Sequence, residues 1–229
     1  MRRRSTRANL LLVSPSEEVY EDEFEANPVI PIEDAIPVYG ERLSYFIAGP
    51  PGCGKSTTIS EILSYFPDQP KYLFTDIEEK DRAFRGIDFR KVKMDPTILQ
   101  SITLDKLTKD GTCWCVFDDV DKIRDPKKSK ILLALMDNIL ANGRSHGKHA
   151  INIIVTSHSL ADYKRTKYSI ENCDYWVIFP SKTMDMQLKT LLKKDGIDKY
   201  LSSLKPLDRV FYHRSSPHFF VFPSMAALI

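Results

Sequence analysis

The sequence contains few cysteines, few glycines and no long apolar run. Its four cysteines lack the Cys-x-x-Cys spacing of a zinc site. Two of them, Cys113 and Cys115, lie in an apolar run where free thiols pack as small hydrophobic groups, so a reducing, intracellular compartment is expected. Every apolar run is far shorter than the roughly 20 residues that cross a bilayer, and the N-terminus lacks the apolar core of a secretory signal. We therefore expect no membrane insertion.

An excess of charge of one sign is also absent. The 229 residues include 33 basic and 31 acidic side chains, a formal net charge of +2. This balance excludes a global electrostatic attraction to nucleic acid, so any DNA binding must come from a local patch. With 42% hydrophobic residues the chain can bury one full core. We interpret it as one domain, residues 41–229, preceded by an extended or disordered arm, residues 1–40.

The scarce glycines gather in one short segment. Three of the nine, Gly49, Gly52 and Gly54, belong to the pattern Gly-x-x-x-x-Gly-Lys-Ser between an apolar run and an amphipathic stretch. This context predicts a P-loop, in which backbone N–H groups and the start of a helix form a cradle for phosphate. Lys55 is expected to reach the β- and γ-phosphates, and the Ser56 hydroxyl to ligate Mg²⁺. The residues expected to bind the nucleotide are Gly49, Pro50, Pro51, Gly52, Cys53, Gly54, Lys55, Ser56 and Thr57.

Short apolar runs alternate with helical patterns from residue 43 onward. Strands are expected at 43–48, 71–75, 112–119, 151–157 and 174–179, and helices at 56–66 and 129–142. Continuous apolar strands separated by helices are typical of a parallel sheet that is covered on both faces. We therefore predict an α/β fold, a three-layer sandwich of the P-loop NTPase type. Two further runs, 209–213 and 218–222, flank the segment RSSP and predict an antiparallel hairpin at one edge of the sheet.

An apolar strand closed by two carboxylates follows the P-loop at the distance of a Walker B motif. Asp118 is expected to hold Mg²⁺, and Asp119 to polarise the attacking water. Adjacent strand residues point to opposite faces, so the two carboxylates can share one site only if the chain turns there. The alternative is a capping aspartate at a strand exit. Because a kinase does not need the second carboxylate, Asp119 favours hydrolysis.

Two further positions have both a functional and a structural interpretation. The strand at 151–157 ends in Thr156 and Ser157, and His158 follows it. Any of the three could sense the γ-phosphate, although His158 could equally cap the next turn. Arg144 follows the long helix in a glycine-flanked turn. It is either a partner for the C-terminal end of the helix dipole or a finger that reaches a neighbouring subunit's γ-phosphate. Basic clusters at 122–130 and 164–167 would suit contact with DNA, or they form solvated faces.

The order of these motifs resembles the DNA-packaging ATPases of nucleocytoplasmic large DNA viruses and virophages, the poxvirus-type branch of the FtsK-HerA superfamily of P-loop NTPases. The segments that carry the resemblance are GPPGCGKS, VFDD, NGRSHGK, INIIVTSHS and DYWVIFPS, within residues 43–222. Many members carry Gln where this chain has Ser157 and His158. The resemblance implies an ATP-driven, homo-oligomeric ring that grips double-stranded DNA, with Arg144 as the finger in trans. It also implies a capsid protein as partner, and action in the host cytoplasm, in a viral factory, and in the virion.

The sequence leaves other function classes open. A small-molecule or nucleoside kinase would use Lys164, Arg165 and Lys167 as lid groups on a monomer. A GTPase is disfavoured because no Asn-Lys-x-Asp sequence follows the Walker B strand, and an ABC-type ATPase because no Ser-Gly-Gly signature accompanies His158. A scaffold protein that binds nucleotide without turning it over is the alternative outside the enzymes.

Overall fold

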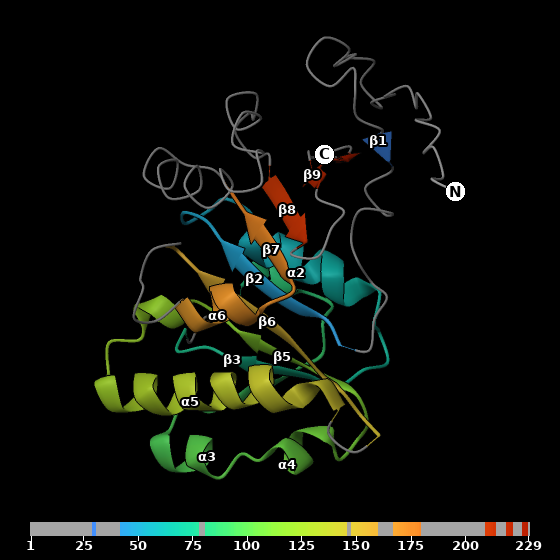
Figure 1. Ribbon diagram of the computed structural model, residues 1–229. Coiled ribbons are helices and arrows are strands. Elements are labelled where there is room, and N and C mark those ends of the chain that lie inside the picture. Colours follow the sequence, from blue (N-terminus) through green and yellow to red (C-terminus); the bar gives the residue numbers. More distant parts are fainter. Residues whose placement is uncertain are drawn as a thin grey trace.

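The computed structural model describes residues 29–30, 42–77, 81–145, 148–159, 167–179, 209–213, 219–221 and 226–228. These residues form one ten-stranded sheet in the order β1-β10-β9-β8-β7-β2-β6-β5-β3-β4 (Figure 1). The strands are β1 (Val29–Ile30), β2 (Ser44–Ala48), β3 (Lys71–Phe74), β4 (Phe89–Val92), β5 (Cys113–Phe117), β6 (Ile151–Ser157), β7 (Tyr175–Ile178), β8 (Arg209–His213), β9 (Phe219–Val221) and β10 (Ala226–Leu228). From β7 to β4 neighbouring strands are parallel, and from β1 to β7 they are antiparallel.

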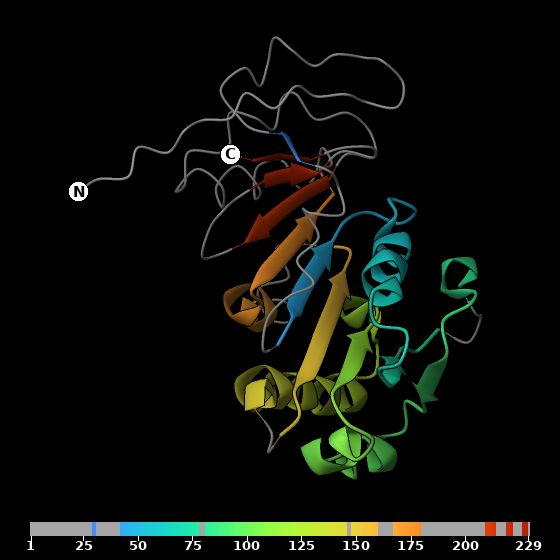
Figure 2. The same ribbon diagram turned by 90° about the vertical axis from the view of Figure 1, so that its right-hand side faces the viewer.

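Helices cover both faces of the parallel part of the sheet. The α-helices are α2 (Lys55–Ser64), α3 (Pro96–Gln100), α4 (Leu104–Thr108), α5 (Pro126–Asn142) and α6 (Lys167–Asn172), and the 3-10 turns are η1 (Arg82–Phe84), η2 (Val120–Lys122) and η3 (Gly143–Ser145). One face packs against α3, α4, α5 and α6, and the other against α2 and η1. Figure 2 shows α2 and α6 on opposite sides of the sheet. The predicted three-layer α/β sandwich is confirmed.

The central strands are apolar on both faces because each face has its own core. In β5 the side chains alternate: Cys113 and Cys115 pack toward α5, and Trp114 and Val116 pack toward α2. Every residue of β2, β5 and β6 is buried. A strand that is covered on both faces reads as a continuous apolar run, which is why the sequence locates these strands well.

Helix α5 begins three residues before its predicted start. The Asp125 carboxylate accepts hydrogen bonds from the backbone N–H groups of Lys127 (2.8 Å) and Lys128 (3.2 Å), so Asp125 is the N-cap. Pro126 follows at the first helical position, where its fixed φ suits a helix and its missing N–H is not needed. The polar capping turn precedes the apolar pattern, and the pattern alone therefore places the helix start too late.

The two ends of the sheet are built differently. The predicted hairpin is confirmed: β8 pairs with β9 in antiparallel register, and β8 extends the sheet from β7. Strand β10 continues the sheet, and Val29 and Ile30 of the predicted arm pair with Ala227 and Ala226. The boundary near residue 40 stays a prediction. At the other end lies β4, which was not predicted because its exposed Arg90 and Lys91 interrupt the apolar pattern.

The six parallel strands define two opposite edges of the sheet. The carboxyl edge lies where β2, β5 and β6 end, at Ala48, Phe117 and Ser157, and the amino edge where β2 and β7 begin, at Ser44 and Tyr175. In open α/β sheets, ligands bind outside the carboxyl ends of the strands. Among the described residues, no helix is both long enough and apolar enough to cross a membrane.

Candidate nucleotide-binding and hydrolysis site

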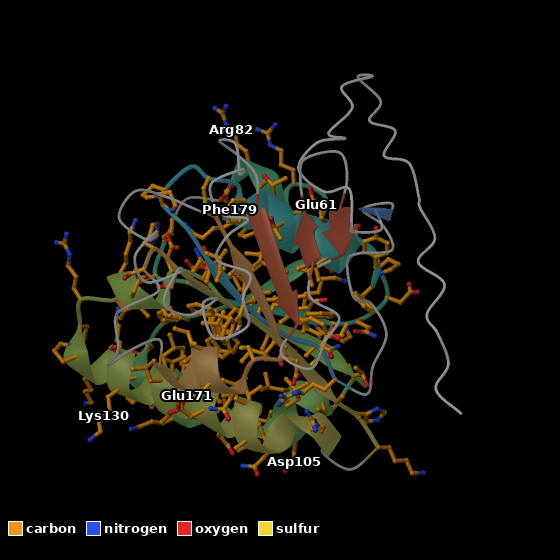
Figure 3. All side chains as sticks on the ribbon, turned by 45° about the horizontal axis from the view of Figure 1, so that its top comes forward. Glu61, Arg82, Asp105, Lys130, Glu171 and Phe179 are labelled. Atoms are coloured by element: carbon orange, nitrogen blue, oxygen red, sulfur yellow. The ribbon has the colours of Figure 1, made fainter. Side chains whose placement is uncertain are left out.

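The loop between β2 and α2 needs its glycines for two different reasons. Gly54 has φ 109° and Gly52 has φ 76°, both in the left-handed region that favours glycine. Gly49 instead lacks room: a Cβ there would lie 2.5 Å from Cys53 Sγ and 2.7 Å from Phe179 Cβ. Phe179 follows β7 and packs beneath the loop, where Figure 3 labels it. It is a support for the P-loop that the sequence motif does not reveal.

The start of α2 offers its N–H groups to a ligand. Its N-cap, Gly54, has no side chain to accept them, and its first turn holds no acidic residue. Lys55 lies across the loop, with Nζ 3.0 Å from the Gly49 carbonyl oxygen and 3.4 Å from that of Pro50. An ammonium group and helix-terminal N–H groups at one place are the donors that a polyphosphate requires. Pro51, Gly52 and Thr57 are exposed along the same segment.

The chain turns sharply at the end of β5. Asp119 is the one described non-glycine residue with positive φ, at 51°. Its backbone N–H donates to Thr156 Oγ1 over 2.8 Å, and the Thr156 hydroxyl donates to Asp118 Oδ1 over 2.9 Å. Thr156 Oγ1 also lies 3.5 Å from Asp119 Oδ1. This turn brings both carboxylates to one threonine on β6, which strict strand alternation would not allow.

Asp118 is in an environment that disfavours its negative charge. The residue is only 8% exposed. Burial, and then the neighbouring charge of Asp119, raise the pKa of Asp118 to about 6, although the Thr156 hydroxyl and Lys55 oppose the shift. A divalent cation would compensate this buried carboxylate. The chemistry of Asp118 therefore fits Mg²⁺. Ser56 lies at the start of α2, and its role as a second ligand stays a prediction.

The loop before α2, the turn after β5 and the end of β6 meet at Asp119. Lys55 Nζ lies 4.0 Å from Asp119 Oδ1, and His158 Nδ1 lies 3.3 Å from the same oxygen. The structure thus gathers Lys55, Asp118, Asp119 and His158 at the carboxyl edge. His158 lies beside the second carboxylate, a position that suits the predicted sensor, and that role stays a prediction.

A third carboxylate at this site escaped the sequence reasoning. Asp121 Oδ2 accepts the backbone N–H of His158 over 3.0 Å, and Asp121 Oδ1 lies 3.5 Å from His158 Nδ1. One carboxylate oxygen each of Asp119 and Asp121 and one ring nitrogen of His158, atoms of the kind that ligate metals, all lie within 4.8 Å of one another. The only signal in the sequence was a further acidic residue two positions after Asp119, in VFDDVDK.

Arg144 lies apart from these residues, at the amino edge. It belongs to η3, and Gly143 of the same turn packs against Ile151 at the start of β6. Arg144 Nη2 lies 3.6 Å from Asp174 Oδ1, immediately before β7, while its side chain remains 62% exposed. A five-residue strand at roughly 3.3 Å per residue separates the two edges by about 16 Å, so Arg144 does not reach the P-loop of its own subunit. Of the basic segment 164–167, residues 164–166 lie outside the described residues.

Comparisons with known proteins agree with this geometry. No model of a known protein family matches the chain. Over 150 residues the chain is 27% identical to the uncharacterized protein V3 of Sputnik virophage, a match that spans 63% of this chain and 58% of that protein. The genome packaging NTPase B204 of Sulfolobus turreted icosahedral virus 2, solved in complex with ATPγS, superposes with a TM-score of 0.53 at 12% identity, covering 81% of this chain and 100% of that one.

The chain has the fold of a viral genome-packaging NTPase. The conjugation coupling protein TcpA of pCW3, solved with ATPγS, also superposes, with a TM-score of 0.51 at 12% identity over 96% of this chain and 69% of that one. Both neighbours are α/β proteins solved with the same ATP analogue. At this level of identity the similarity is one of fold.

Proposed function

We propose that the chain is an ATP-hydrolysing motor that translocates double-stranded DNA and packages a viral genome into a capsid. The observation that carries the proposal is the junction at Asp119, where Lys55 Nζ lies 4.0 Å from a carboxylate joined through Thr156 to Asp118. A P-loop lysine beside an acidic pair is the equipment for phosphoryl transfer to water. Fold similarity to packaging and conjugation proteins supports the DNA substrate.

Each group at the carboxyl edge has a role in this proposal. The loop Gly49–Thr57 cradles the phosphates of ATP, and Lys55 exchanges its contacts with loop carbonyls for contacts with phosphate oxygens. Ser56 and Asp118 hold Mg²⁺, which when bound offsets the negative charge of the phosphates. Asp119 orients the attacking water. The Asp119→Asn variant, which has a neutral amide in its place, should bind ATP but hydrolyse it poorly.

The position of Arg144 supports a ring in which neighbouring subunits complete each other's sites. Because Arg144 lies at the opposite edge of the sheet from its own P-loop, it can serve as a finger only toward another copy of the chain. Its high exposure suits an interface residue that is free of its own subunit's core. The test is to mix Arg144→Ala subunits with Asp119→Asn subunits. Recovery of hydrolysis at hybrid interfaces supports a trans finger, and no recovery at any ratio contradicts it.

A basic segment beside the Walker B turn suits contact with the DNA backbone. Lys122, Arg124, Lys127 and Lys130 are all exposed between η2 and the first turns of α5. Lys128 instead pairs with Asp76, at 3.2 Å. Figure 3 shows Lys130 extending from α5 away from the sheet. Exposed lysine and arginine side chains within a few residues of the hydrolytic carboxylates would link DNA phosphates to the nucleotide state.

Phosphate release separates the motor from the alternatives. Purified protein with Mg²⁺ and ATP should release inorganic phosphate without any added acceptor, and Asp119→Asn should bind ATP but release little. Asp125→Asn, which keeps an oxygen acceptor at the α5 N-cap four residues after Asp121, is the matched control and should retain turnover. Transfer of the γ-phosphate to a small-molecule acceptor would establish a kinase instead. Binding without turnover would establish a nucleotide-gated scaffold.

The capsid protein and the place of action follow from the packaging role. We propose that the protein works in a viral factory in the host cytoplasm and that a capsid protein docks it at the portal of entry for DNA. Co-purification of the protein with capsid protein from infected cells tests the partner. Absence from both the factory and the virion would contradict the packaging role while leaving the ATPase intact.

A further inference from the structure

Asp121 contacts His158 at two points. One carboxylate oxygen, Oδ2, accepts the His158 backbone N–H over 3.0 Å, and the other, Oδ1, lies 3.5 Å from Nδ1 of the imidazole. The side chains of His158 and Asp121 are 14% and 11% exposed, so water competes little for these contacts. A single carboxylate therefore bonds the backbone of His158 and lies beside its ring.

Asp121 itself is held by a short and well-anchored turn. It lies in η2, where the Lys122 N–H donates to the Asp119 carbonyl over 2.9 Å. The preceding residue, Val120, is buried in the core. The turn thus sets where Asp121 lies relative to Asp119.

The imidazole faces two carboxylates through a single nitrogen. His158 Nδ1 lies 3.3 Å from Asp119 Oδ1 and 3.5 Å from Asp121 Oδ1, while Lys55 approaches Asp119 from the P-loop at 4.0 Å. The ring therefore lies against both carboxylates, although Nδ1 makes no hydrogen bond to either of them. A displaced ring would take the imidazole away from this oxygen of Asp119 and leave Lys55 beside it.

We propose that Asp121 is a positioning residue that clamps His158 against Asp119 and so couples the end of β6 to the hydrolytic carboxylate. The inference rests on the proposed ATPase function, and it assigns a residue to that site which no motif identified. In this proposal Asp121 acts through His158, whereas Lys55 and the N–H groups of the P-loop bind the phosphates, so the loss of Asp121 should lower kcat without weakening the binding of ATP.

A double-mutant cycle tests the clamp through turnover. Asp121→Ala should lower kcat roughly 10- to 100-fold, as expected when a catalytic group loses its orientation, while the Kd for ATP stays within about twofold. His158→Ala should have a similar effect, and the double variant should be no slower than the worse single variant. Additive losses would overturn the proposal. Asp125→Ala, which removes a capping carboxylate four residues away, controls for destabilisation of the segment.

Hydrogen exchange tests the same contact without relying on activity. The His158 amide should be protected in the wild-type protein because its N–H donates to Asp121. Exchange should become at least about tenfold faster in Asp121→Ala and remain nearly unchanged in Asp125→Ala, since protection reports local opening. Unchanged exchange in Asp121→Ala would overturn the clamp. A protected amide in a protein that releases no phosphate would instead show that the clamp exists and that the proposed function is wrong.

Discussion

The two edges of the parallel sheet treat their charges in opposite ways. At the amino edge, buried Arg42 donates to the carbonyl oxygens of Ile139 and Leu140 at the end of α5, and Asp174 lies between Arg42 and Arg144. At the carboxyl edge, Asp118 and Asp119 are adjacent in sequence and share one threonine hydroxyl. Opposite charges alternate at the first edge, and like charges are crowded at the second.

This difference separates charges that the fold itself pairs from charges that a ligand would compensate. Burial lowers the pKa of Arg42, but the nearby charge of Asp174 opposes that shift. Cations near the last carbonyls of a helix are favourable, and Arg42 has two such acceptors. The raised pKa of Asp118 shows that the folded protein resists a negative charge at that position. A site that costs stability in the free protein can recover it when a cation and a polyphosphate bind.

The largest expected effect is at Lys55. Lys55→Ala should reduce phosphate release by roughly 100- to 1,000-fold or more, because it removes a positive charge from the developing charge on the phosphates. Lys71 provides the comparison, since it is equally buried and donates to the carbonyls of Phe66, Pro67 and Gln69. Lys71→Met should lower the melting temperature and leave turnover per folded molecule nearly intact. An equal loss of turnover in both variants would contradict a catalytic role that is specific to Lys55.

Asp118→Asn should stabilise the free protein while it abolishes Mg²⁺-dependent hydrolysis. The folded pKa of about 6 exceeds the ordinary 3.8, so ionisation disfavours the folded state and the wild-type protein loses stability as the pH rises from about 4 to 6. A shift of about two units corresponds to about 3 kcal/mol as an upper value. Urea unfolding at pH 7.5 without Mg²⁺ should show the variant to be more stable. A variant less stable than the wild type would contradict the raised pKa of Asp118 in the folded protein.

Arg42→Met should have the reverse effect on stability. The change removes the side-chain donor from the Leu140 carbonyl, one of two donors from the Ile139 carbonyl, and the buried cation beside Asp174, a loss of about 2 kcal/mol in the free energy of unfolding. The exposed pair Arg90 and Asp110 is the control, and Arg90→Met should change the unfolding free energy little. Denaturant titration of the wild type and the two variants measures both losses. Equal losses of unfolding free energy would show that the buried Arg42 contributes no more to stability than the exposed Arg90.

The smallest effect is expected on the basic segment. Lys127→Glu should weaken binding to double-stranded DNA a few-fold and make the slope of log K against log salt shallower by about one unit. Basal phosphate release without DNA should not change, because Lys127 is exposed and its side chain contacts none of the P-loop residues in the structure described. An identical salt slope in wild type and variant would remove this segment from the DNA contact.

The parts of the fold with strong apolar patterns could be predicted from the sequence. Strand β6 matches its expected bounds, and β2, β3, β5 and β7 differ by one or two residues at their ends. Strand β4 was missed because an edge strand alternates charged with half-buried residues, and α3 and α4 are too short for a helical period to appear. The start of α5 was predicted three residues too late because its polar N-cap, Asp125, precedes the apolar pattern.

Site residues that belong to one local motif could be predicted from the sequence. Site residues that only the folded chain brings together could not. The P-loop, Asp118 and Asp119 are local patterns. Asp121 and Phe179 matter through contacts with residues far along the chain, Asp121 with His158 and Phe179 with Gly49. No spacing in the sequence reports such contacts. The same limit applies to Arg144, whose place at the amino edge became clear only from the sheet order.

The most direct test of the account is steady-state ATP hydrolysis with and without double-stranded DNA. Wild-type protein and the Asp119→Asn and Lys127→Glu variants should be compared at one salt concentration. The account predicts that DNA stimulates phosphate release by the wild type, that Lys127→Glu loses part of this stimulation, and that Asp119→Asn shows almost no release under either condition. Phosphate release that is equal with and without DNA, or that persists in Asp119→Asn, would contradict a DNA motor driven from the carboxyl edge.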